Sequence, residues 1–452
     1  MPGPLEGVKV VDLTAFINGP SATGQMCEQG ADVLKVEPGT GEPMRMSGGG
    51  PGIYFSTFEM YNRGKMSMTL DLKHPDSKHV MKRLVEWADV LAENFTPGVM
   101  DRLGLSYETV KGWNPRIIYA SNSGFGPTGK WARRPSYDGM AQGFTGVLAA
   151  NGGGPSHEPR PIGFTFSDVV GGNYFYSAIL AALYGRERTN KGSHVICSQA
   201  GATLYFQRAA VSQALGNFGG AQSDDGQHAW GSPHLVFQQV HKASDGQRVV
   251  ITMTKRDQLE RFCKNVIKRP DLLTPSLLKR WPVCPPVDGK RLLAEVSRVV
   301  VTKPMQHWID AMVGAKVPCS PISSYADLAD KSTSVGQHMY DNGYMVDINH
   351  RDFGKLNWVG YPVEFTGTPN ENIVENQSWH APYIGEHTDL MLAKLGYSPG
   401  ELDQLKNSGA VPSPSGPFAA ENAKQMTVKY AAKMAKKRAD FIQKRKQGRS
   451  KL

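Results

Sequence analysis

Asp168 is the carboxylate of this sequence whose surroundings most suggest chemistry. It follows an aromatic run and precedes the apolar segment 174–184, whose spacing predicts a buried helix. The apolar positions at helical spacing are Tyr176, Ile179, Leu180 and Leu183. A carboxylate at the N-terminal end of a helix lies near the positive end of the helix dipole, which favours an ionised nucleophile. The alternative is that Asp168 only caps this helix, a common use of aspartate.

A glycine pattern between residues 124 and 129 (GFGPTG) invites a second interpretation, as a phosphate-binding loop. Trp131 stands where such a loop needs a Ser or Thr for the magnesium ion. Pro127 also disfavours the helix that would receive the phosphates. We therefore expect a loop in which glycine permits close backbone contact, and no nucleotide site.

The elements that must position these residues follow a repeating order. A short strand at 7–11 precedes a helix from about 18 to 29, and a second strand follows at 32–37. Further strands are expected at 68–72, 89–92 and 116–120, with an amphipathic helix at 76–88. Strands that alternate with helices predict an α/β fold with a parallel, Rossmann-like sheet.

Changes in composition predict the domain organisation. A large α/β domain is expected at 1–213, a linker rich in Gly, Asp, Ser and His at 214–234, and a smaller α/β domain at 235–325. The chain should then return to the large domain at 326–410, with a hairpin near 345–365. Residues 411–452 read as a flexible linker (PSPSGP) followed by a basic tail.

Charge and cysteine content exclude several classes of protein. The net charge is +10, and residues 421–452 carry 11 Lys or Arg against two acidic residues, a net +9, which leaves about +1 for the rest. A nucleic-acid surface across the folded body is therefore not expected. The five cysteines are scattered without a CxxC pair, which favours a reducing compartment without disulfides or a metal. No secretory signal or long apolar run is present, so a cytoplasmic location without a membrane span is expected.

Ten short motifs, in order along residues 5 to 400, resemble the family III CoA-transferases, which include formyl-CoA transferase and, as a cousin branch, α-methylacyl-CoA racemase. The motifs are GVKVVDLT, GADVLKVEP (30–38), NRGK (62–65), LDLKHP (70–75), ADVLAENFTPG (88–98), RLGL (102–105), NPRIIYAS (114–121), SGFG (123–126), SYDGMAQ (136–142) and APYIGEHT (381–388). The resemblance implies a large domain built from both chain ends, a small domain between linkers, and an interlocked dimer.

The resemblance implies that Asp168 is the nucleophile of a CoA-transferase that uses acyl-CoA and needs no metal. Its carboxylate would attack the thioester to give a mixed anhydride, which CoA reopens to an aspartyl-CoA thioester for a second carboxylate. Gly171 and Gly172 would leave room for the thioester and offer N–H groups to an oxyanion. The residues expected to contact CoA and substrate are Asn94, Phe95, Arg102, Ile17, Asn18 and Tyr137.

Two alternatives to a transferase stay open. The racemases of this group use a His-Asp dipeptide that aligns with Tyr137-Asp138, and a tyrosine is a poor proton acceptor at neutral pH. His157 does not stand at the matching position. A non-catalytic subunit of a heteromeric transferase is the second alternative, against which the retained Asp168 argues. Pro38, and Ile17 or Asn18, replace residues used by formyl-CoA transferase, so formate and oxalate are not the expected substrates.

The chain ends in Ser450-Lys451-Leu452 behind the basic residues of the tail. A terminal Ser-Lys-Leu is a peroxisomal address, so a peroxisomal location is expected if the host is a eukaryote. A solvated extension is the alternative interpretation of the tail.

Overall fold

The computed structural model describes residues 3–46, 53–153, 157–216, 238–282, 286–367 and 380–415. Most of the predicted linker at 214–234 and all of the tail beyond 415, with Ser450, Lys451 and Leu452, lie outside the described residues. The chain forms two compact units. The first comprises the described residues of Met1–Thr145, Ile162–Phe206 and Asn342–Leu452, and the second those of Gly146–Pro161 and Gln207–Asp341.

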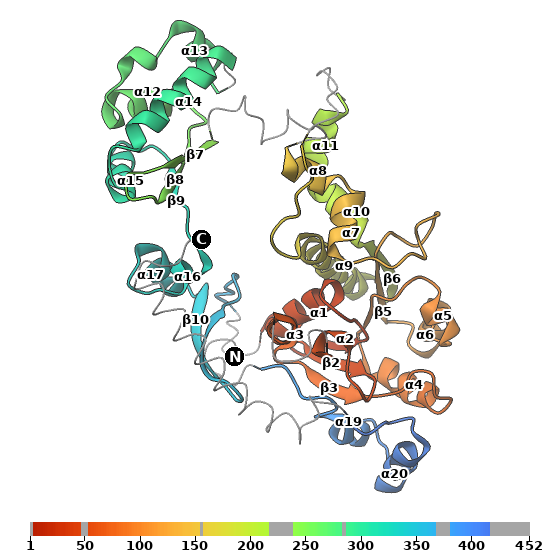
Figure 1. The fold of residues 1–452 in the computed structure, drawn as a ribbon. Helices are drawn as coiled ribbons and strands as arrows, with labels where there is room; N and C mark the ends of the chain where they lie inside the picture. Colours follow the sequence, from red (N-terminus) through yellow and green to blue (C-terminus); the bar gives the residue numbers. More distant parts are fainter. Residues whose placement is uncertain are drawn as a thin grey trace. The chain divides into compact units, whose positions relative to one another are not determined.

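A six-stranded parallel sheet organises the first unit, in the order β3-β2-β1-β4-β5-β6 (Figure 1). Its strands are β1 (Lys9–Asp12), β2 (Asp32–Glu37), β3 (Met66–Thr69), β4 (Val90–Glu93), β5 (Ile118–Ser123) and β6 (Ser193–Ser198). The predicted α/β fold with a parallel sheet is confirmed. The strand order reverses between β1 and β4, which pair with each other, and ligands bind at such switch points beyond the carboxyl ends of the strands.

Helices cover both faces of the sheet, because neighbouring residues of each strand face opposite sides and both sides are apolar. On one face, Val10, Val90 and Ile118 pack with α1 and α9. On the other face, Val11, Leu91 and Tyr119 pack with α4, α6 and α19. The helices of this unit are α1 (Asn18–Glu28), α2 (Pro43–Met46), α3 (Ile53–Asn62), α4 (Ser77–Trp87), α5 (Val99–Arg102), α6 (Tyr107–Trp113), α7 (Asp138–Phe144), α9 (Phe166–Thr189), α10 (Gln199–Phe206), α19 (Thr388–Lys394) and α20 (Pro399–Ser408).

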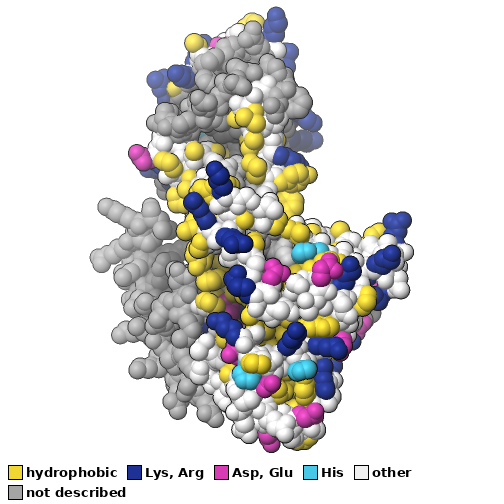
Figure 2. Space-filling model, turned by 90° about the vertical axis from the view of Figure 1, so that its right-hand side faces the viewer, with side chains coloured by type: hydrophobic (Ala, Val, Ile, Leu, Met, Phe, Trp, Pro, Cys, Tyr) yellow, Lys and Arg dark blue, Asp and Glu magenta, His cyan; other side chains and the backbone are white. Residues whose placement is uncertain are grey.

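The expected hairpin is present as β10 (Met345–His350) and β11 (Gly354–Val359), which pair in antiparallel register. Figure 2 shows one face of the molecule, where Lys and Arg side chains lie interspersed with Asp and Glu over its lower half.

The second unit contains a three-stranded antiparallel sheet, in the order β7 (Gln238–Lys242), β8 (Arg248–Thr252) and β9 (Cys319–Pro321). Its helix α12 (Arg256–Arg261) is continued by a π-helical turn (Phe262–Val266). The other helices are α8 (Val147–Gly152), α11 (Arg208–Ala214), a 3₁₀ turn (Pro270–Leu272), α13 (Pro275–Arg280), α14 (Pro286–Val300), α15 (Met305–Gly314), α16 (Tyr325–Leu328) and α17 (Ser334–Asp341). Its core is formed by residues such as Ile251, Phe262 and Trp308.

Candidate active site

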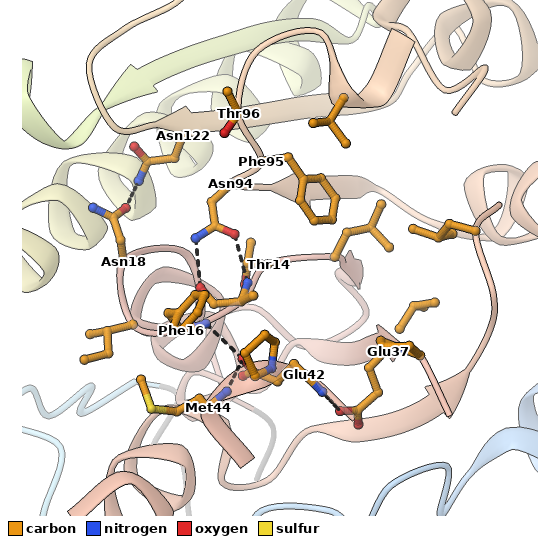
Figure 3. A pocket seen from close by; sticks show the side chains of 18 of the residues that line it. Thr14, Phe16, Asn18, Glu37, Glu42, Met44, Asn94, Phe95, Thr96 and Asn122 are labelled. Atoms are coloured by element: carbon orange, nitrogen blue, oxygen red, sulfur yellow. Dashed lines mark hydrogen bonds between the residues drawn. The ribbon is translucent and has the colours of Figure 1, made fainter. Parts of the chain in front are cut away.

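A cavity of about 1200 Å³ lies beyond the carboxyl ends of the central strands, within the first unit (Figure 3). Its wall is formed by the segments that follow β1, β2, β3, β4 and β5, and by residues of α7, α9 and α10. Six of the seven residues predicted from the sequence line it: Asp168, Asn94, Phe95, Ile17, Asn18 and Tyr137. The seventh, Arg102, does not.

The loop between β1 and α1 forms one side of the cavity and has an unusual backbone. Phe16 adopts a left-handed conformation with φ of 64°, which is uncommon for a bulky aromatic residue. Asn94 holds the preceding residue, because its Oδ1 accepts from the Ala15 N–H at 2.8 Å and its Nδ2 donates to the Ala15 carbonyl at 2.9 Å. The Phe16 N–H donates to Glu42 Oε2 at 2.9 Å. These tertiary bonds, drawn in Figure 3, hold a conformation that the local sequence does not favour.

Several predicted residues take part in this packing. Asn18 and Asn122 are both buried, and the Asn122 amide donates to Asn18 Oδ1 (Figure 3). Ile17 packs with Met44 and Phe58 in a small apolar cluster. The Tyr137 ring meets Phe16 edge to face, with ring centroids 5.4 Å apart.

Phe95 contributes its ring to the large apolar cluster on one face of the sheet and also lines the cavity. Arg102 is exposed at the end of α5 and lines a smaller cavity of about 240 Å³ with Lys73, His74 and Lys78. Lys73 lines both cavities, as do two neighbouring leucines, so the basic group borders the large cavity.

Asp168 lies in the first turn of α9, two residues after the helix begins at Phe166. The N-cap position belongs to Thr165, so the interpretation of Asp168 as the cap is wrong. Asp138, the first residue of α7, takes over this role, because its Oδ1 accepts from the N–H groups of Ser167 at 2.7 Å and Asp168 at 3.2 Å. The carboxylate of Asp138 therefore satisfies backbone groups that a helix leaves without partners, and the side chain of Asp168 faces the cavity.

The side chain of Asp168 has one direct polar contact in the described structure: Gln199 Nε2 donates to its Oδ1 at 2.6 Å. Burial, together with the negative charge of Asp138, raises the pKa of Asp168 to about 7. The sequence had suggested a carboxylate kept ionised by the helix dipole. At this position removal from water outweighs that dipole, and a perturbed carboxyl group in a cavity is typical of catalytic sites.

Gly171 and Gly172 do not act as their place in the sequence suggested. They lie inside α9 where it packs on α1, and their N–H groups belong to the helical hydrogen-bond ladder. A β-carbon on Gly171 would overlap the Asn18 amide, and one on Gly172 would overlap Ser21. These glycines therefore permit close helix packing, which seats Asp168 beside the β1 loop, and the expectation that they bind an oxyanion is wrong.

The glycine pattern at 124–129 forms a loop, as expected, with left-handed φ at Gly126 and Gly129. A β-carbon on Gly124 would overlap Ser136, and the Gly124 carbonyl accepts from the Ala200 N–H at 2.9 Å. The close contact brings Ser136 toward the start of α10, where Gln199 lies.

Sequence reasoning missed Gln199 and the capping role of Asp138. Asp138 entered the sequence analysis only as part of the Tyr137-Asp138 dipeptide. No sequence pattern marks Gln199, because it reaches the cavity only through the position of β6 in the assembled sheet.

No three His, Cys, Asp or Glu side chains of the described residues gather as metal ligands. Among the same residues, no helix combines the length and apolar character needed to span a membrane.

The sequence matches CoA-transferase family III over residues 5–388. Acetyl-CoA:oxalate CoA-transferase of Acetobacter aceti is 36% identical over 375 residues, which cover 81% of this chain and 92% of that protein. Succinyl-CoA:glutarate CoA-transferase of Mus musculus is 30% identical over 414 residues, 90% of each chain. The crystal structure of a CaiB/BaiF family protein from Brucella suis matches with a TM-score of 0.71 and 28% identity, over 87% of this chain and 100% of that one. The chain therefore belongs to CoA-transferase family III, as its motifs predicted.

Proposed function

We propose that this enzyme moves CoA from an acyl-CoA thioester to a second carboxylic acid through covalent intermediates on Asp168. The carboxylate attacks the thioester carbon, the C–S bond breaks, and a mixed anhydride forms with release of CoA thiolate. The thiolate then attacks Asp168 Cγ and releases the first acid, which leaves an aspartyl-CoA thioester. An acceptor carboxylate reverses the sequence and leaves as the new acyl-CoA.

One observation carries this proposal: a carboxyl group with a pKa of about 7 faces a cavity lined by five of the six residues expected to contact CoA and substrate. Such a group is ionised above neutral pH, yet it is poorly hydrated and therefore a stronger nucleophile than an exposed carboxylate. The relatives support the reaction class, because their names pair an acyl-CoA with a carboxylate.

The alternatives are less well supported. A racemase needs a second acid-base group near the substrate, and no histidine occurs among the described residues that line the cavity. A subunit without activity would not need the partly buried Asp168 with its raised pKa that this chain retains.

The acceptor can be chosen from the relatives and from this sequence. Relatives named for oxalate and for glutarate both match. Because Pro38, and Ile17 or Asn18, depart from the formyl-CoA transferase pattern, we propose a carboxylate other than formate or oxalate, with glutarate as the first acceptor to test. The enzyme would act as an interlocked homodimer and would need no metal. Light scattering tests the dimer, which should have a mass near twice that of the chain.

The deciding experiment is to incubate the enzyme with acetyl-, succinyl- or formyl-CoA and each of oxalate, glutarate and succinate, and to identify the products by mass spectrometry. Transfer that is lost in Asp168→Ala, with the variant still folded by circular dichroism, supports the proposal. Uptake of deuterium at the α-carbon of a 2-methylacyl-CoA in D₂O, without transfer to any acid, would favour the racemase.

A further inference from the structure

Gln199 is the side chain in direct polar contact with the proposed nucleophile. It is the first residue of α10, follows β6 without a connecting loop, and is only 3% exposed. Its Nε2 donates to Asp168 Oδ1 at 2.6 Å. No donor among the described residues forms a hydrogen bond with the other oxygen, Oδ2. The two oxygens of Asp168 therefore differ: Oδ1 is held, and Oδ2 is the one available to attack.

The orientation of the Gln199 amide is determined by Ser136. The Ser136 hydroxyl donates to Gln199 Oε1 at 2.9 Å, which leaves the NH₂ group directed at Asp168. Ser136 is itself positioned by the close contact with Gly124. A neutral amide suits this place, because an ammonium or guanidinium group would form an ion pair with the carboxylate and weaken it as a nucleophile.

The nearest backbone donors are already engaged, and two buried side-chain donors, Asn18 Nδ2 and Ser167 Oγ, form no hydrogen bond with Asp168 or with any other described group. The N–H groups of Ser167 and Asp168, at the start of α9, donate to Asp138. The N–H groups of Gly171 and Gly172 lie within the helix. Among the described groups around the carboxyl, the Gln199 amide is the donor that forms a hydrogen bond with Oδ1.

We infer that Gln199 is a catalytic residue, whose amide N–H stabilises the negative charge that develops on Asp168 Oδ1 when CoA attacks Cγ. This inference rests on the proposed function. In that step the thiolate sulfur forms a bond to Cγ, and the pair of electrons of the C=O bond moves to Oδ1. The carbonyl then re-forms, the Cγ–Oδ2 bond breaks, and the first acid leaves as a carboxylate that carries Oδ2. The same donor serves when the acceptor carboxylate attacks the aspartyl thioester. Ser136 is a positioning residue that acts through Gln199.

The test measures the covalent intermediate directly. Wild type and variants are mixed with acyl-CoA, quenched on the millisecond scale, and analysed for CoA attached to the peptide that contains Asp168. In Gln199→Leu we expect attachment to slow by about 10²- to 10³-fold, the usual effect of removing an oxyanion donor. Affinity for a non-reactive thioether analogue of the acyl-CoA should stay within about threefold of wild type, because Gln199 acts on the charge that forms during reaction.

Two further variants separate catalysis from folding. Gln25→Leu is the matched control, since Gln25 bonds to Ser21 and Asn173 and does not line the cavity; it should react like wild type. Ser136→Ala keeps Gln199 but frees its Oε1, and we expect an intermediate loss of about tenfold. If Gln199→Leu does not fold, Ser136→Ala decides in the same way.

The pH profile of the rate of CoA attachment gives a further readout. Its acid limb should move to higher pH in Gln199→Leu, because a hydrogen bond to the charged carboxylate is lost.

Attachment in Gln199→Leu or Ser136→Ala at the wild-type rate, with an unmoved acid limb, would overturn the role of Gln199 while leaving Asp168 as the nucleophile. A wild-type enzyme that transfers CoA but never carries it on the Asp168 peptide would overturn the covalent mechanism and this inference together.

Discussion

Asp138 caps the helix that carries Asp168. Its Oδ1 accepts from the backbone N–H groups of Ser167 and Asp168, while its Oδ2 accepts from the Gln142 amide at 2.5 Å. One carboxylate thus fixes the start of α9, and its charge also raises the pKa of the carboxyl group next to it. The structural role and the electrostatic role can be separated by substitution.

Asp138→Asn should shift the acid limb of kcat/KM to lower pH. The asparagine keeps an acceptor for the helix N–H groups but removes the negative charge, so the pKa of Asp168 falls from about 7. The measurement is kcat/KM for the acyl-CoA across pH 5 to 9, with Asp32→Asn as the control because Asp32 is exposed at the start of β2. Asp138→Ala removes the acceptor too and should lower the free energy of unfolding by about 1 kcal/mol. An acid limb that does not move in Asp138→Asn would contradict this electrostatic role.

Asp168→Asn should abolish transfer and stabilise the protein above neutral pH. The pKa of Asp168 is about 7 in the folded protein and near 3.9 in an unfolded chain. Because the folded state holds the proton to higher pH, wild-type stability falls as pH rises from about 4 to 7 and is not recovered above it. The Asp168→Asn variant has a neutral side chain and does not lose stability in this way. Its Tm should therefore exceed the wild-type Tm by more at pH 8 than at pH 5.

The free-energy advantage at pH 8 should be at most about 4 kcal/mol, and less to the extent that solvent reaches the carboxyl group. Thermal unfolding of both proteins at the two pH values measures it. If the Tm difference between the two proteins were the same at pH 5 and pH 8, burial of the ionised Asp168 would not destabilise the wild-type fold.

The sheet was predictable because its strands are short apolar runs separated by helices with clear starts. Val10 and Val11 face opposite sides and are both buried, which is why the run reads as a parallel strand. Asn94 and Phe95 were assigned to the site by the family resemblance alone; in the fold they line the cavity because they follow β4 directly, and the ends of neighbouring parallel strands meet.

What could not be predicted depends on tertiary contacts. The left-handed Phe16 opposes the preference of its own residue type and is held by bonds from Asn94 and Glu42, which are far away in the sequence. Gln199 is 31 residues from Asp168 along the chain, and the two meet only because β6 joins the edge of the sheet next to β5. The early start of α9 could not be seen because its cap, Asp138, comes from another helix.

Asn94→Ala should raise KM for acyl-CoA and reduce stability. It removes both hydrogen bonds to Ala15, so the loop that carries Phe16 loses its anchor, at a cost of about 1–3 kcal/mol. Asn114 offers a matched control, since its amide also donates to backbone carbonyls, those of Val85 and Ala88, but it does not line the cavity. Asn114→Ala should lose similar stability with an unchanged KM. If both variants changed KM equally, the effect would be one of general stability.

Arg102→Gln should weaken binding of CoA through its phosphates. Arg102 lies with Lys73, His74 and Lys78 around a small cavity that borders the large one, and such a group attracts anionic ligands. We expect KM for acyl-CoA to rise about tenfold at low salt with kcat little changed, because the contact is the same in the ground state and the transition state. The effect should shrink as ionic strength rises, since exposed charges are screened. Arg298→Gln, at an exposed position in α14, is the control and should leave KM unchanged.

The 3′-dephospho form of the same acyl-CoA then shows which phosphate Arg102 contacts. If Arg102 binds the 3′-phosphate, wild type and Arg102→Gln should share one KM for this analogue. If it binds the diphosphate, the tenfold difference should persist, and an Arg102→Gln enzyme with wild-type KM for both substrates would remove Arg102 from the binding site.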